Sequence, residues 1–587
     1  MTLSNLSIQC AVILLCNSCI THQNQPVSES STTGSPMFST HHWVATDALG
    51  RTLPSYEDVG QKKEDKFVGV FYYIWHGYHG NKIYDITQIL KQPESDRHWG
   101  PKGKFHFWGE PEYGYYRSDD PWVIRKDLQM LSNADVDFIF FDVTNNRTYL
   151  KTVKLLCEIS TEMRQQGIST PEICFLSNTK SGRVMNELYD EFYSKGLHED
   201  LWFRWDGKPL VLGHPEDTVL RPEVKDFFTI KYSWAWTKTK EEPNHWQWLD
   251  KYPQDYGWKE DPNVPEQITV SVAHHPGNPL GKSYQNGKQP LVNDDYNTDF
   301  TDMGLQFQEQ WDRALEVDPQ VVMVTQWNEW LAQRFDHRAG KTEFAGKPIS
   351  EHVPMFVDVF TKEFNRDIAP MKGGYTDNYY YQLISNIRRY KGITPPPNEY
   401  SNAPIKIDGQ FSDWADVLPV YQDPVNDITH RDHAGYDPSL RLTNTTGRND
   451  IIESRVSYDE QALYAYAKTS NVLTSSKDPN WMLLFLDTDK NKSTGWEGYD
   501  FLINQSVDEN TSSIQKWTEN GWSTIGETKL SYSGSELELS IPLAKLELEA
   551  KPSFYFHWSD NPQQLTDIDA FFLDGDSAPD RRFDFDY

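Results

Sequence analysis

The sequence predicts an α/β protein: a (β/α)8 TIM barrel followed by an all-β sandwich domain. Three observations predict this architecture. Seven apolar strand runs alternate with helical segments over residues 66–395, a proline-rich linker occupies 396–404, and short alternating strand runs fill 405–587. A chain of 587 residues is also too long for one hydrophobic core, so at least two domains are expected.

The first 65 residues are predicted to precede the folded domains. The apolar run at 10–16 is too short to cross a bilayer, which needs about 20 residues, and is similar to the centre of a signal peptide. We predict a signal peptide at 1–21, with Cys19 as the lipidated residue of a loose lipoprotein motif. Residues 22–65, rich in Ser, Thr, Gln and Pro, are predicted to form a flexible tether. We therefore predict that the protein is exported to the periplasm or the outer-membrane surface of a bacterium. Its only predicted attachment to a membrane is a lipid anchor at Cys19.

The barrel prediction depends on continuous apolar runs, which are typical of parallel strands that helices cover on both faces. The seven runs lie at 67–75, 136–143, 172–178, 209–214, 227–236, 267–275 and 321–329. A weaker eighth run lies near Met355–Val359. A doubly wound open sheet is the alternative, but no glycine-rich phosphate loop follows the first run.

Helix signals separate the strand runs. Asp120 and Pro121 form an N-cap and first-turn pair that begins one helix, and the last helix of the barrel is predicted over 376–389. Cys157 lies in a helical pattern and Cys174 in a strand pattern, so both are predicted to be buried thiols that bind no metal.

Polar and aromatic residues follow the predicted barrel strands. Active sites of such barrels lie at the carboxyl ends of the strands. The residues at these ends are Trp75, His76, Asp142, Asn178, His214, Trp234, His274, Trp327, Asn328 and Glu329. One such residue is more often a helix cap or a structural hydrogen-bond partner. Seven strand ends of this kind on one rim favour a site.

Glu329 is the strongest single candidate. It lies between Trp327 and Trp330, where a carboxylate must be hydrogen-bonded or must have a raised pKa. A Glu in such surroundings is suited to general acid or base catalysis. The structural alternative is that Glu329 is an acceptor within a helix cap.

The motif "TQWNEW" at 325–330, after "GVFYYIWHG" at 69–77, resembles the barrel enzymes of glycoside hydrolase family 99, the endo-α-mannosidase group. The resemblance implies a glycan-cleaving barrel in which a strand-end Asn-Glu-Trp carries one working carboxylate and a second Glu follows three residues later. Residues 328–330 match this pattern, but Ala332 stands where the second Glu is expected. The resemblance therefore does not extend to α-mannoside as the substrate.

A second carboxyl group must come from elsewhere, because glycoside hydrolysis ordinarily uses two. Asp142 is the predicted partner, since it follows the apolar run that ends strand two. Glu110 and Glu112 are the alternatives, in the aromatic loop at 106–122. That loop is predicted either to form sugar-stacking walls or to be a packed lid without a role in binding. The predicted substrate-binding residues are Trp75, His76, Trp108, Glu110, Arg117, Asn178, His214, Trp234, His274, Trp327 and Asn328.

The C-terminal region resembles family 9 carbohydrate-binding modules in the segments 407–417, 486–504 and 571–587. Trp496 and Trp558 are candidates to stack on sugar, although tryptophans are more often core residues.

Alternating oxygens at Asp487, Asp489 and Asn491 predict a structural Ca²⁺ site in the same region. An Asx-rich turn without metal is the alternative. No cofactor is predicted for catalysis.

These observations predict an exported or surface-anchored, endo-acting glycoside hydrolase that acts on a polysaccharide or complex oligosaccharide. Twenty-one Trp and 31 Tyr suit a protein that stacks on sugar rings. A net charge of −30, from 56 Lys and Arg against 86 Asp and Glu, excludes a typical nucleic-acid partner. A non-catalytic glycan-binding protein on a degenerate barrel is the alternative, which Ala332 favours.

Overall fold

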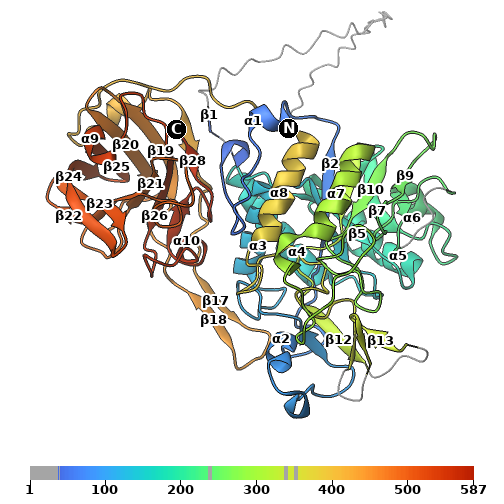
Figure 1. Cartoon of the computed structure of the whole chain (residues 1–587). Coiled ribbons are helices and arrows are strands. Elements are labelled where there is room, and N and C mark those ends of the chain that lie inside the picture. Colours follow the sequence, from blue (N-terminus) through green and yellow to red (C-terminus); the bar gives the residue numbers. More distant parts are fainter. Residues whose placement is uncertain (1–36, 39, 236–240, 336–340, 350–353) are drawn as a thin grey trace, which may run out of the picture. The chain divides into compact units, whose positions relative to one another are not determined.

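The structure, a computed structural model, describes residues 37–587 apart from 39, 236–240, 336–340 and 350–353 (Figure 1). The predicted signal peptide, Cys19 and the first part of the predicted tether lie outside the described residues. Within the described part of the chain, no helix is both long and apolar enough to span a bilayer.

A parallel sheet forms the centre of the N-terminal half, and its seven strands coincide with the seven predicted runs. Their order across the sheet is β8-β7-β5-β4-β2-β11-β10, and every neighbouring pair is parallel. The strands are β2 (Phe67–Tyr72), β4 (Phe138–Asp142), β5 (Glu172–Leu176), β7 (Lys208–Gly213), β8 (Thr229–Tyr232), β10 (Gln267–Val270) and β11 (Val321–Val324). Short antiparallel strands, β6 (Arg204–Trp205) and β9 (Tyr256–Gly257), pair with β7 and β10.

The predicted eighth barrel strand is wrong. Strand β15 (Met355–Val357) pairs antiparallel with β12 (Leu331–Phe335), which also pairs with β3 (Phe105–Phe107) in a separate sheet. Among the described residues, no strand pairing joins β8 to β10. The N-terminal half is therefore a curled parallel sheet, and a closed eight-stranded barrel is not confirmed.

Aromatic packing fills one face of this sheet. A buried cluster joins side chains of five strands: Phe71, Phe138, Phe140, Cys174, Leu176, Leu210, Leu212, Val321 and Met323. Such a shared cluster is expected on the concave face of a curled sheet. The ring of Phe138 lies against the backbone of Gly69, where an added Cβ would be 2.2 Å from the ring. Strand β2 therefore requires glycine at position 69.

Six helices of more than one turn accompany the sheet: α3 (Pro121–Asn133), α4 (Leu150–Gln165), α5 (Ser181–Glu191), α6 (Pro222–Phe227), α7 (Leu305–Val317) and α8 (Asn378–Lys391). Helix α3 begins as predicted, since Asp120 accepts a hydrogen bond from the Trp122 N–H at 3.1 Å and Pro121 occupies the first turn. Helix α8 confirms the predicted last helix. The thiols of Cys157 and Cys174 are buried, as predicted.

Antiparallel strands form the C-terminal half, as predicted. They follow one hydrogen-bonded path, β16-β19-β20-β25-β24-β23-β22-β21-β26-β27, with β28 beside β26. The strands are β16 (Val420–Gln422), β19 (Ile451–Tyr458), β20 (Ala462–Thr469), β21 (Leu483–Asp487), β22 (Phe501–Asp508), β23 (Thr511–Thr518), β24 (Gly521–Ser533), β25 (Glu536–Pro542), β26 (Tyr555–Asp560), β27 (Asp576–Ala578) and β28 (Phe585–Asp586). These strands thus form one continuous sheet rather than two separately bonded sheets.

The second part of the predicted tether is packed against the fold, contrary to the prediction. Trp43 is 1% exposed, and its ring centroid lies 5.3 Å from that of Phe583. Val44 and Asp584 exchange backbone hydrogen bonds of 3.0 and 2.8 Å, and Arg388 donates to the Trp43 carbonyl at 2.9 Å. The polar composition of this segment predicted disorder, but its tryptophan and backbone groups find partners distant in sequence.

A hairpin from the C-terminal half reaches the aromatic loop of the N-terminal half. Its strands are β17 (Arg431–Ala434) and β18 (Arg441–Asn444). At its turn, the Tyr436 N–H donates to the Tyr115 carbonyl at 2.7 Å, and the Tyr436 ring lies 5.0 Å from Phe107. The hairpin therefore helps to hold this loop in place.

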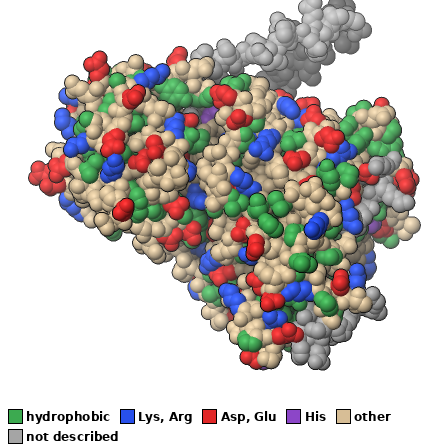
Figure 2. Space-filling model, viewed as in Figure 1, with side chains coloured by type: hydrophobic (Ala, Val, Ile, Leu, Met, Phe, Trp, Pro, Cys, Tyr) green, Lys and Arg blue, Asp and Glu red, His purple; other side chains and the backbone are tan. Residues whose placement is uncertain are grey.

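Buried ion pairs join the same loop to the C-terminal residues. Arg581 donates two hydrogen bonds of 2.8 Å to the two carboxylate oxygens of Glu112. The Arg581 and Glu112 side chains are only 1% and 8% exposed. On the face shown in Figure 2, by contrast, acidic and basic side chains are interspersed in solvent.

Arg581→Met is expected to destabilise the protein, because it leaves the Glu112 carboxylate buried without its partner. Loss of one member of a buried pair typically costs about 3–5 kcal/mol. The midpoint of urea unfolding measures this loss. The matched control is Arg441→Met, whose pair with Asp432 is 58% and 68% exposed, so its loss should change the midpoint little. Equal midpoints for the two variants would contradict the expected role of the Arg581 pair.

Candidate active site at the carboxyl ends of the parallel strands

Glu329 lies five residues beyond the end of β11 and is 6% exposed. The Trp327 N–H donates to the Phe71 carbonyl of β2 at 2.8 Å, so the chain after β11 remains attached to the sheet. The Glu329 N–H donates to Asp367 Oδ1 at 2.6 Å. Two neighbouring segments thus hold the backbone of Glu329 in place.

Two donors bind one oxygen of the Glu329 carboxyl group. Arg366 Nη2 lies 3.1 Å from Oε2, and Gln326 Nε2 donates to the same oxygen. Arg366 Nε donates to Gln326 Oε1 at 2.6 Å, which completes a three-residue ring of contacts. Neither of these two donors binds Oε1 of Glu329.

Burial raises the pKa of Glu329 well above its ordinary value. The negative charges of Asp358, Asp367 and Asp142 add to this effect, and the guanidinium of Arg366 opposes it. A buried carboxyl group whose pKa is raised in this way has the electrostatic surroundings of a general acid.

Asp142, the predicted partner, ends β4 and lies in the same site. Strand β2 pairs with β4 on one side and β11 on the other, so Asp142 and Glu329 follow strands that flank β2. Trp75 Nε1 donates to Asp142 Oδ2 at 2.8 Å, and the N–H and hydroxyl of Thr144 donate to Oδ1 at 3.0 and 2.7 Å. Burial raises the pKa of Asp142, and these three hydrogen bonds oppose the rise.

Tyr73, just beyond β2, is a site residue that the sequence analysis missed. Its hydroxyl is buried and has no hydrogen-bond partner in the described part of the chain. Burial raises the pKa of this hydroxyl, and the charges of Glu329 and Asp142 raise it further. An unpaired hydroxyl close to both carboxyl groups is available to donate to a bound ligand or water.

The segment after β15 supplies three further residues that the sequence analysis missed. Asp358 is half-buried, takes a left-handed backbone with φ of 72°, and accepts a hydrogen bond from Arg366 Nη1 at its carbonyl, 2.8 Å away. Asp367 holds the Glu329 backbone, and burial raises its pKa to about 7 against the opposing charge of Lys282. No motif marked these residues, because 355–359 was interpreted as a barrel strand.

Two aromatic groups flank the carboxyl groups. Trp75 lies 4.1 Å from Tyr73 and is stacked parallel to Tyr149 at 6.2 Å. Trp234, half-buried, is stacked on Trp248 at 5.5 Å. Arg366 lies 5.3 Å from the Trp248 ring, so the second stack is linked to the Glu329 cluster.

Five predicted substrate-binding residues are instead fully buried parts of the scaffold: His76, Trp108, His274, Trp327 and Asn328. Trp108 stacks on Trp330 at 4.6 Å and donates to Asp367 at 2.8 Å. Asn328 accepts from the Tyr73 N–H at 2.8 Å. Burial lowers the pKa of both His76 and His274 to about 3, so neither is a proton donor near neutral pH.

The remaining predicted contacts lie at partly exposed positions. Asn178 follows β5, and His214 follows β7 with its ring stacked on Tyr232 at 5.0 Å. In the aromatic loop, Glu110 pairs with Lys372 at 2.6 Å and Arg117 with Asp119 at 2.9 Å. Glu112, an alternative catalytic carboxylate, is bound by Arg581 and is not the partner of Glu329.

The predicted Ca²⁺ turn contains both carboxylates and an ammonium group. The Asn491 N–H donates to Asp487 Oδ1 at 3.2 Å and to Asp489 Oδ1 at 3.0 Å, as in an Asx turn. Oxygens of Asp487, Asp489 and Asp500 lie within 4.8 Å of one another, but Lys492 Nζ lies 3.6 Å from Asp487. A cation here competes with Lys492, and Ca²⁺ binding at this turn stays a prediction.

Trp496 and Trp558 do not form a sugar-stacking surface. They are 7% and 0% exposed, and Trp558 donates to Ser454 at 2.9 Å within the sheet core.

No protein-family model and no curated protein matches the chain. Among solved structures, the GH99 endo-alpha-mannosidase from Bacteroides thetaiotaomicron is similar at 16% identity, over 56% of this chain and 98% of that chain, with a TM-score of 0.32. Its complex with BIS-TRIS-propane gives 15% identity and the same coverage and TM-score. A family 9 carbohydrate-binding module from Caldicellulosiruptor kristjanssonii in complex with glucose gives 15% identity, over 27% and 75%, with a TM-score of 0.17. At these TM-scores we base the functional proposal on the side chains of the site.

The raised pKa of Glu329 predicts a measurable pH dependence of stability. The folded state holds a proton that the unfolded carboxyl group, with an ordinary value of 4.5, has lost. The contribution of this proton to the free energy of unfolding is complete below pH 4.5. It is lost as the pH rises toward the pKa of the folded state, by at most about 1.4 kcal/mol per pH unit. Glu329→Gln removes the titration, so wild type should lose stability relative to the variant as the pH rises above 4.5. Parallel stability curves from urea unfolding would contradict the raised pKa.

Proposed function

We propose that the protein is a glycoside hydrolase in which Glu329 is the general acid and Asp142 the carboxylate partner. The observation that supports this most is the contrast between the two groups. Burial raises the pKa of both groups, well above its ordinary value for Glu329, whereas three hydrogen bonds to Asp142 favour its charged form. Carboxyl groups in two such environments divide the acid and base roles of glycoside hydrolysis.

In this mechanism Glu329 donates its proton from Oε1 to the oxygen of the glycosidic bond as that bond breaks. Arg366 and Gln326 hold Oε2 and stabilise the carboxylate that forms. Asp142 either attacks the anomeric carbon or removes a proton from the attacking water. The Tyr73 hydroxyl donates a hydrogen bond to the sugar or to that water.

The aromatic groups favour a carbohydrate ligand. Trp234 has a half-buried indole ring stacked on Trp248, and such rings stack on the apolar faces of sugars, whereas the buried Trp75 positions Asp142. We propose a polysaccharide or complex oligosaccharide as the substrate and an endo mode of action. We further propose that the protein acts after export, anchored through Cys19.

A non-catalytic glycan-binding protein is the second candidate, and one observation favours it. Ala332 is fully buried in β12, paired with His106 of β3, at the position where the resemblance predicts a second Glu. The second candidate predicts binding of glycans without cleavage.

Release of reducing ends from a panel of neutral and sulfated polysaccharides tests the proposal. Wild type should cleave at least one glycan, and Glu329→Gln and Asp142→Asn should each lower kcat by at least a hundredfold, as expected for general acid–base groups. Asp358→Asn tests the half-buried carboxylate whose charge, among those of the neighbouring residues, raises the pKa of Glu329 most.

The matched control is Glu110→Gln, which removes a carboxylate of the adjacent loop that is paired with Lys372. This variant should keep wild-type kcat. Binding without cleavage by wild type would reject the hydrolase and support the glycan-binding candidate. Loss of activity in Asp358→Asn but not in Asp142→Asn would move the partner role to Asp358.

Tyr73→Phe separates a role in the reaction from a role in folding. The variant removes a buried hydroxyl that lacks a partner, so its stability should equal or exceed that of wild type. Its kcat/KM should fall at least tenfold, because the lost hydrogen bond is made to the ligand. Unchanged kcat/KM, or a large loss of stability, would show that Tyr73 acts in the scaffold instead.

A further inference from the structure

A second group of buried carboxylates lies in the C-terminal half, outside the proposed active site. Asp423 follows β16, Asp427 lies four residues later, and Asp576 begins β27. These residues are 9%, 4% and 4% exposed. One carboxylate oxygen from each lies within 4.8 Å of the others.

Several oxygens of this cluster lack the hydrogen bonds that burial normally requires. Both oxygens of Asp423 and Oδ1 of Asp427 have no hydrogen-bond partner among the described residues. Asp576 Oδ2, by contrast, accepts from the Ile451 N–H at 2.6 Å. Buried polar groups are nearly always bonded, and an unpaired buried carboxylate is costly. The unpaired oxygens therefore point to a ligand.

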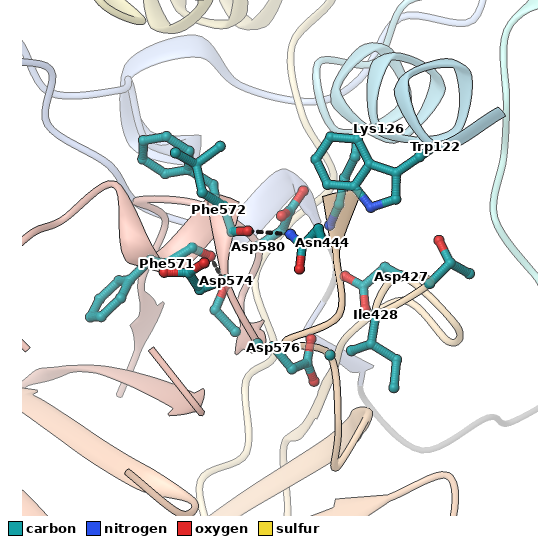
Figure 3. A pocket seen from close by; sticks show the side chains of 15 residues that line it. Trp122, Lys126, Asp427, Ile428, Asn444, Phe571, Phe572, Asp574, Asp576 and Asp580 are labelled. Carbon is teal, nitrogen blue, oxygen red and sulfur yellow. Dashed lines mark hydrogen bonds between the residues drawn. The ribbon is translucent and has the colours of Figure 1, made fainter. Parts of the chain in front are cut away.

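The charged residues around this carboxylate cluster are mostly acidic, and one nearby ammonium group, that of Lys126, partly offsets their negative charge. Asp450 and Asp580 lie close enough to raise the pKa of Asp423, while the ammonium group of Lys126 lowers that of Asp427. Asp427, Asp576, Asp580 and Lys126 line one small cavity of about 20 Å³ (Figure 3). A space of this size accommodates one water molecule or one ion.

Two of these groups have other partners. Asp450 accepts two hydrogen bonds from the Asn426 N–H, at 3.0 and 3.1 Å, and Asp580 accepts from Asn133 of α3 at 3.0 Å. The unpaired oxygens belong to Asp423 and Asp427 alone within this group of five aspartates.

We propose that Asp423, Asp427 and Asp576 bind one Ca²⁺ ion. All three offer hard oxygen ligands, which suit Ca²⁺ or Mg²⁺ rather than Zn²⁺ or Cu²⁺. Two oxygens on one Ca²⁺ ion, each about 2.3–2.6 Å from it, lie at most about 5 Å apart, which agrees with the observed spacing. Burial favours Ca²⁺, because Mg²⁺ usually keeps several of its water ligands. The site is separate from the turn at 487–491.

The ion connects the loop after β16 to the start of β27, beside helix α3 of the N-terminal half. Lys126 of α3 lines the adjoining cavity, and Asn133 of the same helix binds Asp580. Bound Ca²⁺ therefore stabilises the contact between the two halves as well as the C-terminal sheet.

Calcium titration of the full-length protein tests this site. Protein treated with EDTA and exchanged into chelator-free buffer is titrated with CaCl2 by calorimetry, and its Tm is measured with and without CaCl2. Wild type should bind Ca²⁺ and gain several degrees in Tm. Asp423→Asn and Asp427→Asn, each nearly equal in volume to wild type, should bind Ca²⁺ at least tenfold more weakly and lose most of the gain.

Asp489→Asn is the control, because it removes a carboxylate from the other acidic turn and should retain the binding event. Far-UV circular dichroism identifies any variant that fails to fold. If one of Asp423→Asn and Asp427→Asn does not fold, the other is compared with wild type. Equal Ca²⁺ affinity in wild type and both variants would overturn the site. Absence of any Ca²⁺ effect on wild type would also overturn it and would indicate that shared protons stabilise the carboxylates.

Discussion

Desolvation of the Glu329 carboxyl group is the constraint on which the proposed active site depends. A buried carboxyl group must be neutral, paired or hydrogen-bonded, and the structure provides pairing and hydrogen bonding on one oxygen only. Arg366 donates hydrogen bonds to this oxygen, to Gln326 and to the Asp358 carbonyl, and its guanidinium also lies 5.3 Å from the Trp248 ring. Because one guanidinium joins these elements, Arg366 sets the position of the acid relative to the aromatic side chains.

Fully buried residues form the support beneath this cluster. Asp367 accepts from the Glu329 N–H and from Trp108, while Lys282 donates to the Asp367 carbonyl at 2.9 Å. Lys282 also lies 3.8 Å from the Tyr375 ring, and burial lowers its pKa. The scaffold therefore contains charged groups that the chemistry does not use directly, and their partners keep the catalytic carboxyl group in one geometry.

The C-terminal half contributes to the same site through packing. Its hairpin binds the aromatic loop at Tyr115, and Arg581 neutralises the Glu112 carboxylate of that loop. The proposed Ca²⁺ cluster follows the same rule as the active site, because both collect buried carboxyl groups. In the active site a retained proton lowers the repulsion, whereas the C-terminal cluster has the unpaired oxygens and spacing that suit a divalent cation.

The sequence by itself determined the seven parallel strands and indicated Glu329 as the candidate carboxyl group. Continuous apolar runs placed all seven parallel strands, Asp120 and Pro121 placed the start of α3, and the Trp-flanked Glu329 indicated the site. These signals are local, since each depends on the spacing of neighbouring residues.

Only the tertiary structure decided which residues surround Glu329. Asp358 lies in the apolar run that predicted an eighth strand, and Arg366 lies seven residues beyond that run. Trp108, Asn328, His76 and His274 proved to be buried supports. Trp43 likewise belongs to the core although its segment has the composition of a tether. The physical reason is that burial and pairing depend on groups distant in the chain. A side chain's own sequence neighbours do not reveal whether it meets water, a counter-charge or a ring.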